Sequence, residues 1–168
     1  FQVSRLMEKF GIFQLLSDAK DGLTMDEVVE QTALSRYAVK VLLESSLTIG
    51  TVLYESERFV ISKAGWILHT DPLASINLRF NHDVNYLGMY HMEEALLNGK
   101  PEGLKVFGQW KTIYEGLSSL PEDAQKSWLD FDHFYSDNSF DEALQIVFSY
   151  KPATLLDVGG NTGRWALR

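Results

Sequence analysis

The sequence predicts a mainly α-helical fold: a winged helix-turn-helix domain over residues 1–72, a helical connector over 73–151, and the first β-strand and turn of a truncated α/β domain over 152–168. Three observations support this prediction. Apolar residues recur at helical spacing through the first two segments. A short hairpin signal follows two helices in the first segment. A buried-strand pattern runs directly into a glycine cluster at the end of the chain.

Composition limits the classes of function. The 168 residues are 45% hydrophobic and 12% aromatic, which is enough for a packed core and excludes intrinsic disorder. A net charge of −8 opposes binding to a phosphate backbone. The absence of cysteine excludes a disulfide framework and a thiolate metal site, and it fits a cytoplasmic location. No apolar run approaches the ~18 residues of a membrane span, so no membrane partner is expected.

The first sixteen residues are unusually apolar. Val3, Leu6, Met7 and Phe10 follow the i, i+3, i+4, i+7 spacing of an amphipathic helix, and Gly11 interrupts it. One helix stripe on a small domain would bury about half of the large apolar side chains present here. The surplus predicts a homodimer through the N-terminal helices; the alternative is a monomer in which both stripes fold back on the helices at 82–150. The nine side chains are Phe1, Val3, Leu6, Met7, Phe10, Ile12, Phe13, Leu15 and Leu16.

A helix-turn-helix with a wing is predicted next. Thr24 and Glu27 form a capping box for one helix, and Ser35 caps the following one. Residues 51–54 and 59–61 then flank a four-residue turn, which is the pattern of a β-hairpin. A short helix capped by Ser62 should end the domain before Pro72. The second helix offers few cations and the wing is largely acidic, so a packing or dimerisation module is favoured over a DNA reader.

The connector should contain helices over 82–97 and 109–117, one opened by Pro121, and one with a capping box of Ser139 and Glu142. The four histidines of the chain, three of them in the connector, lack the spacing of a zinc site, so no metal ligand is predicted. The connector is also rich in aromatic residues, which either belong to the core or line an aromatic acceptor pocket. The candidates for that substrate pocket are Trp110, Phe131, Phe134 and Tyr135.

Residues 153–158 have a buried-strand pattern, and glycines 159, 160 and 163 follow at once. Glycines let a backbone turn tightly, and the N-terminus of the helix expected from Trp165 would attract an anion. The loop is therefore either a structural turn or a nucleotide-type site. Its spacing is not G-x-G-x-x-G, which disfavours NAD. A lone strand cannot bury its faces, so we expect the first βα unit of a truncated Rossmann-like domain.

The segment LLDVGGNTG resembles motif I of the class I S-adenosylmethionine-dependent methyltransferases. The order of winged helix, connector and motif I is similar to the small-molecule O-methyltransferases, the group that contains plant caffeate and antibiotic-tailoring enzymes. The stretches GLTMDEVVEQTALSRYAVKVLLESSLTIG, FVISKAGWIL and EEALLNGKPEGLKVFG carry the rest of the resemblance.

The resemblance implies a role for the glycine loop in binding the methionine moiety of S-adenosylmethionine. Asn161 replaces the middle glycine of the family pattern, and asparagine also tolerates left-handed backbone geometry. FDHFY at 131–135 falls where the family usually has F-x-x-A-M, so Phe134 and Tyr135 change the shape of the acceptor pocket. The cofactor-binding residues implied are Asp157, Gly159, Gly160, Asn161 and Gly163.

The family's ribose-binding acid and catalytic histidine lie downstream, so no catalytic residue is expected within 1–168 and this piece should be inactive. The function expected from the sequence is that of the N-terminal part of a cytoplasmic, homodimeric O-methyltransferase acting on a small, aromatic, hydroxylated acceptor. The alternative is a winged-helix transcriptional regulator or dimerisation adaptor without catalysis.

Overall fold

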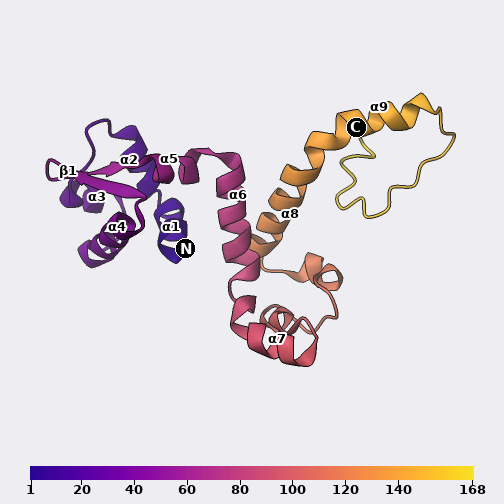
Figure 1. The fold of residues 1–168 in the computed structure, drawn as a ribbon, viewed down its shortest axis with the longest axis horizontal. Helices are drawn as coiled ribbons and strands as arrows, with labels where there is room; N and C mark the ends of the chain where they lie inside the picture. Colours follow the sequence, from indigo (N-terminus) through magenta and orange to yellow (C-terminus); the bar gives the residue numbers. More distant parts are fainter.

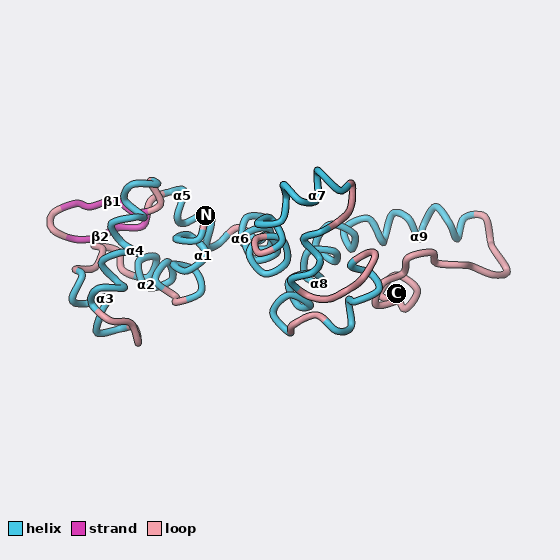
Figure 2. The backbone as a smooth tube through the Cα atoms, turned by 90° about the horizontal axis from the view of Figure 1, so that it is seen from below, coloured by secondary structure: helices cyan, strands magenta, loops and turns pink.

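A computed structural model describes all residues 1–168, and it confirms that the chain is mainly helical. Nine α-helices are joined by short 3₁₀ and π turns, and two strands form the one sheet. The N-terminal unit is compact, and α6 leads from it into an extended group of helices (Figures 1 and 2). The C-terminal segment leaves α9 and loops back toward the junction of α8 and α9 (Figure 1).

Helices α1 (Gln2–Lys9) and α2 (Ile12–Asp18) are separated at Gly11, whose φ of 70° is the left-handed geometry that ends the first stripe. Their apolar side chains form much of a ten-residue core within the N-terminal unit, completed by Val28, Val39, Leu42, Leu43, Val52 and Phe59. Of the nine large apolar residues near the N-terminus, only Phe1 and Phe10 are exposed, at 49% and 41%. The exposed apolar surface is therefore smaller than the sequence suggested.

The expected caps of α3 (Met25–Gln31) and α4 (Arg36–Ile49) are confirmed. Thr24 and Glu27 make both hydrogen bonds of a capping box, and Ser35 Oγ accepts from the Ala38 N–H at 3.2 Å. Strands β1 (Val52–Glu55) and β2 (Arg58–Ile61) pair antiparallel. Helix α5 (Lys63–Thr70) follows, and Ser62 caps it as expected.

The connector departs from the expected helices. Asp71 leads directly into α6 (Pro72–Phe80). The long helix expected over 82–97 is divided into a π-helical turn (Asn81–Asn85), a 3₁₀ turn (Gly88–His91) and α7 (Met92–Asn98). A 3₁₀ turn (Glu102–Val106) then packs back on the previous one through Gly88 and Gly103; a Cβ on Gly103 would lie 2.8 Å from the Gly88 carbonyl oxygen. Gly88 and Gly103 can approach this closely only because the chain folds back on itself between them.

The helix expected over 109–117 is also wrong, since only a 3₁₀ turn (Ile113–Ser119) forms there. The Trp110 ring packs against Gly108 and Gly116 and occupies the space that a Cβ at either glycine would need. A continuous helix from Gln109 would separate these groups. The segment is folded around the indole ring.

Helix α8 (Glu122–Ser136) begins after Pro121 as expected, and it packs against α6 through the rings of Phe80, Trp128 and Phe131. A 3₁₀ turn (Asp137–Ser139) joins it to α9 (Phe140–Ser149). The capping box expected at Ser139 is wrong: its backbone is helical, and its hydroxyl donates to the Ser136 carbonyl oxygen at 2.8 Å. The chain enters α9 without the extended residue that an N-cap requires.

The strand expected over 153–158 and the helix expected from Trp165 do not form. A strand needs a neighbour for its backbone hydrogen bonds, and the only two strands of the structure pair with each other in the N-terminal unit. The left-handed turns of the glycine loop are confirmed, with φ of 79° at Gly159, 48° at Asn161 and 76° at Gly163.

Candidate functional site

The glycine loop curls around the carboxylate of Asp157. A Cβ added to Gly160 would lie 2.6 Å from Asp157 Oδ2, so only glycine allows this approach. Asp157 Oδ2 is buried and has no hydrogen-bond partner. A buried acceptor without a partner is costly, which makes this oxygen a place where a donor group from a ligand would be stabilised.

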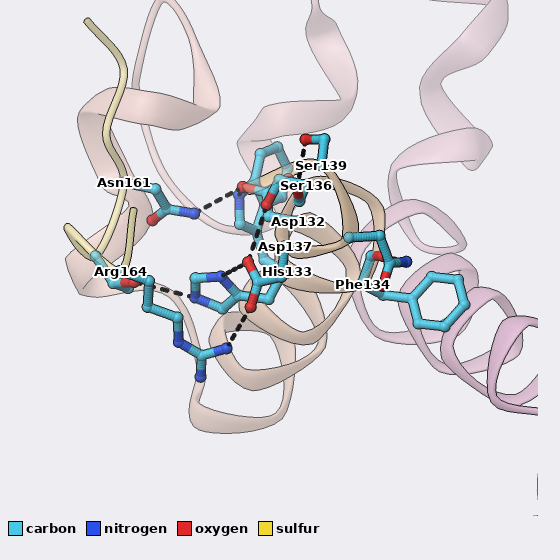
Figure 3. Close-up of polar contacts among 11 residues, drawn as sticks. Asp132, His133, Phe134, Ser136, Asp137, Ser139, Asn161 and Arg164 are labelled. Carbon is cyan, nitrogen blue, oxygen red and sulfur yellow. Dashed lines mark hydrogen bonds and ion pairs between the residues drawn. The ribbon is translucent and has the colours of Figure 1, made fainter. Parts of the chain in front are cut away.

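Side chains of the loop hold it against α8 (Figure 3). Asn161 Nδ2 donates to Asp132 Oδ2 at 3.0 Å. The Thr162 hydroxyl lies 3.1 Å from His133 Nε2, and Arg164 Nη1 donates to Asp137 Oδ2 at 3.0 Å. The loop is therefore fixed through three neighbouring points on one helix and the turn that follows it.

Asp137 is the charged centre of this contact. Partial burial acts to raise the pKa of its carboxyl, but hydrogen bonds from Arg164, His133 and Ser136 outweigh that effect and lower the pKa below its usual value. His133 Nδ1 lies 3.1 Å from Asp137 Oδ1. Asp137 consequently stays ionised near neutral pH and continues to bind Arg164.

A cavity of about 140 Å³ lies between the loop and the junction of α8 and α9. Four of the five predicted cofactor residues line it: Asp157, Gly159, Gly160 and Asn161. Gly163 is not part of the lining. Whole small-molecule sites usually enclose about 300–1,000 Å³, so this cavity suits a small polar end of a ligand, such as an ammonium group facing Asp157.

The structure brings together three of the four residues predicted for the acceptor pocket. Phe131 stacks on Phe80 with ring centroids 4.0 Å apart, and Tyr135 lies 4.8 Å from Phe131. Phe134 meets the Tyr135 ring edge-on at 5.4 Å. Trp110 lies apart from them, against Gly108 and Gly116, and lines a different cavity beside Lys105 and Lys111.

A larger cavity was missed by the sequence analysis. It has a volume of about 1070 Å³ and lies among the π-helical turn, the 3₁₀ turns after it and the middle of α8. Its walls include Val84, Met89, Phe107 and Trp128, which are scattered along the sequence without a shared spacing. Because the expected helix over 82–97 is broken, helical periodicity could not have grouped these residues.

Residues 1–59 match the family model of the Dimerisation2-like domain. No curated protein matches the sequence.

Nine chains from solved structures match the fold. One is the structure of LepI in complex with SAM, with a TM-score of 0.67 and 18% sequence identity. The match covers 99% of this chain and 47% of that one, so the present chain spans about half the length of its structural relative. At this identity the comparison shows a shared fold. None of the helices is both long and apolar enough to cross a membrane.

Proposed function

We propose that this chain is the dimerising and acceptor-binding part of a cytoplasmic S-adenosylmethionine-dependent O-methyltransferase that acts on a small, aromatic, hydroxylated acceptor. The observation that carries the proposal is the fold shared over 99% of the chain with a structure that holds SAM. The Dimerisation2-like match over residues 1–59 supports a homodimer through the N-terminal helices.

The glycine loop supports the choice of cofactor. S-adenosylmethionine ends in an amino acid, whose ammonium group would donate to the unpartnered Asp157 Oδ2. The cavity beside Gly159, Gly160 and Asn161 has room for that end of the molecule and not for the adenosine. The ribose and adenine contacts and the general base are proposed to lie outside residues 1–168.

When bound, S-adenosylmethionine supplies an electrophilic methyl group on a sulfonium. The part proposed for this chain is to orient the acceptor, since holding two reactants in line lowers the barrier to a displacement. The Phe131 and Tyr135 rings, whose centroids lie 4.8 Å apart with planes tilted by 50°, are proposed to contact an aromatic acceptor. The Tyr135 hydroxyl already accepts from Asn77 Nδ2 at 2.9 Å, which fixes the orientation of that ring.

We interpret the α3–α4 pair and its hairpin as a winged helix that packs against protein and not against DNA. The cations on this face are already engaged: Arg36 pairs with Asp26, Lys40 with Glu44 at 3.8 Å, and Arg58 with Glu27 at 2.7 Å. A DNA reader would present such cations to phosphates. This supports a dimerisation module.

The test uses a longer protein that contains residues 1–168 and the following half. Calorimetry should show binding of S-adenosylmethionine by this protein and little binding by residues 1–168 alone. Asp157→Asn should weaken the binding about tenfold, as expected for a charge-assisted hydrogen bond. Asp141→Asn, which changes a carboxylate outside the loop, is the matched control.

The outcomes separate the alternatives. Transfer of labelled methyl to a hydroxylated aromatic, with release of S-adenosylhomocysteine, supports the full proposal. Binding of the cofactor without its consumption would overturn methyl transfer. Failure of the longer protein to bind the cofactor would favour the regulator or adaptor without catalysis.

A further inference from the structure

A third cavity, of about 450 Å³, lies beside Trp110, between the end of α7 and the 3₁₀ turn Ile113–Ser119 (Figure 1). Lysines are concentrated around it. Three of its nine lining residues are Lys100, Lys105 and Lys111, and the only acid among them is Glu102. The whole chain has a net charge of −8, so this excess of cations runs against its overall charge. Cations gathered around a cavity favour an anionic ligand.

Two of the three lysines have no partner in the chain. The Lys105 ammonium pairs with Glu94 and lies 4.0 Å from Glu102 Oε2, so the acid of the lining already has a counter-charge. The ammonium groups of Lys100 and Lys111 make no ion pair and no hydrogen bond within the chain. The lining therefore has two positive charges that are not compensated by the protein.

Backbone donors of the same loop add to this charge. The Trp110 ring packs against Gly108, which fixes the course of the loop. The backbone N–H groups of Gln109 and Trp110 have no acceptor within the chain. The next N–H, that of Lys111, donates to Glu115 Oε2 at 3.3 Å and holds the loop in place. Because Gln109 and Trp110 line the cavity, their N–H groups can donate to an anion bound there.

The lysine-lined cavity is separate from the 1070 Å³ cavity. The two linings share only Pro101 and Leu104. Residues three apart lie on one side of a 3₁₀ helix, and Glu102 and Lys105 of the turn Glu102–Val106 both line the smaller cavity, whereas Gly103 lines the larger one. No charged residue lines the larger cavity. The two linings therefore suit different ligands.

We propose that the lysine-lined cavity binds the dianion of a small phosphate monoester, with the phosphate held by Lys100 and Lys111 and the organic group against Pro101 and Leu104. Two charges on one group match the two unpaired ammonium groups. The three phosphate oxygens can also accept from the free backbone N–H groups. A carboxylate offers one charge and two oxygens, so it matches these donors less well. The volume of about 450 Å³ lies in the range of small-molecule sites and leaves room for an organic group beside the phosphate.

The test is a calorimetric titration of residues 1–168 with phenyl phosphate, phenyl sulfate and inorganic phosphate at pH 7.5 and low salt. Phenyl phosphate is expected to bind about fivefold more tightly than phenyl sulfate, which has a similar shape and one negative charge fewer. Inorganic phosphate should bind more weakly than phenyl phosphate, because it lacks the ring that contacts Pro101 and Leu104. Added sodium chloride should weaken the binding of phenyl phosphate.

Variants locate the site. Lys111→Gln should weaken the binding of phenyl phosphate about threefold, and the double variant Lys100→Gln, Lys111→Gln about tenfold. The double variant should also lose the preference for phenyl phosphate over phenyl sulfate. Lys63→Gln removes another exposed lysine without an ion-pair partner, at the start of α5, and is the matched control that should leave the affinity unchanged.

Amide signals in NMR spectra report on the backbone donors. The signals of Gln109 and Trp110 should move as phenyl phosphate is added, while that of Leu53 in β1 should not. Three results would overturn the proposed site: no binding of phenyl phosphate at millimolar concentration, equal affinity for phenyl phosphate and phenyl sulfate, or unmoved signals of Gln109 and Trp110. An equal loss of affinity in Lys63→Gln and Lys111→Gln would also overturn it, since that result indicates a general attraction of anions. Binding at this site does not depend on methyl transfer, so its failure leaves the proposed function untouched.

Discussion

At the scale of single residues, Glu27 connects a helix cap with the wing. Its carboxylate accepts from the Thr24 N–H at 2.7 Å and from Arg58 Nη2 at 2.7 Å. These hydrogen bonds lower the pKa of Glu27 below its ordinary value of 4.5. The hydrogen bond from the Thr24 backbone has the largest effect. The pair therefore stabilises the fold above pH 4.5, and this stability is lost as the pH falls below that value and through the lowered pKa.

Glu27→Gln should lower the melting temperature at pH 7 and reduce the further loss of stability on acidification below pH 4.5. Thermal melts at pH 7 and pH 3 measure both effects. Glu30→Gln, an exposed position on the same helix, is the control. An unchanged pH dependence in Glu27→Gln would contradict the assignment.

Asp83 is a buried acidic residue whose carboxylate contacts three other side chains. Its side chain is 7% exposed, accepts from the Ser127 hydroxyl at 2.5 Å, and lies 2.7 Å from His82 Nδ1 and 3.7 Å from Arg5 Nη2. Burial acts to raise the pKa of Asp83, and the contacts with Ser127, His82 and Arg5 lower it more. The carboxylate joins α1 to the π-helical turn and α8.

Asp83→Asn should destabilise the chain by about 2–3 kcal/mol, because it leaves the buried Arg5 guanidinium without its counter-charge. Urea unfolding at pH 7 measures the change. Asp130→Asn removes a more exposed carboxylate that pairs with Lys126 and Arg79, and should cost less than about 1 kcal/mol. Equal losses of unfolding free energy in the two variants would contradict a larger contribution from the Asp83 contacts.

At the scale of elements, the contact between α5 and the hairpin depends on Gly65. A Cβ at this position would collide with the Thr51 carbonyl oxygen, a backbone atom that cannot move aside cheaply. Gly65→Ala should therefore destabilise the N-terminal unit by about 1–3 kcal/mol, the usual cost of overpacking. Urea unfolding should show no comparable loss for Ala64→Ser at the exposed neighbouring position, and a neutral Gly65→Ala would rule out the close approach.

The attachment of the C-terminal segment to α8 can be tested by proteolysis. Lys151 precedes Pro152, which blocks trypsin, so Arg164 is the first tryptic site in the segment. Asp137→Asn removes the partner of Arg164 and should speed cleavage at that residue several-fold, as judged by mass spectrometry. Asp141→Asn, which loosens only Arg168, should leave the rate at Arg164 unchanged. Equal rates in both variants would contradict the attachment.

The sequence predicted elements well where local chemistry decides them. Caps at Thr24, Ser35 and Ser62, the hairpin, and the helix break at Gly11 depend on residues that are close in sequence. The elements of the connector were harder to predict, because the Gly88–Gly103 approach and the packing around Trp110 are tertiary contacts that override helical spacing. The strand over 153–158 needs neighbours that no local pattern supplies. Four of the five predicted glycine-loop residues line one cavity and Gly163 does not, whereas Trp110 lies apart from the other aromatic residues predicted with it.

At the scale of the whole molecule, the proposed dimer makes a prediction about mass. The chain mass is 19.1 kDa, so sedimentation equilibrium at micromolar concentration should give about twice that value. Phe10→Asp, which changes an exposed side chain outside the core, should shift the mass toward the monomer. Leu96→Asp on α7 is the control. A monomer at all concentrations, in which both variants are silent, would favour the alternative without self-association.

Asp71 joins the N-terminal unit to the rest of the chain. Its N–H donates to the Ile67 carbonyl oxygen at the end of α5, and its carbonyl oxygen and side chain accept from Ser75 and Ala74 at the start of α6. Pro72 follows with its φ fixed by the ring. No flexible linker separates α5 and α6, so the two helices move together as one bent unit. In the proposed dimer, this junction and the Asp83 contacts among α1, the π-helical turn and α8 together set the direction in which α6 carries the aromatic cluster and the cavities. The proposed dimer would therefore fix the orientation of the aromatic cluster through this junction and those contacts.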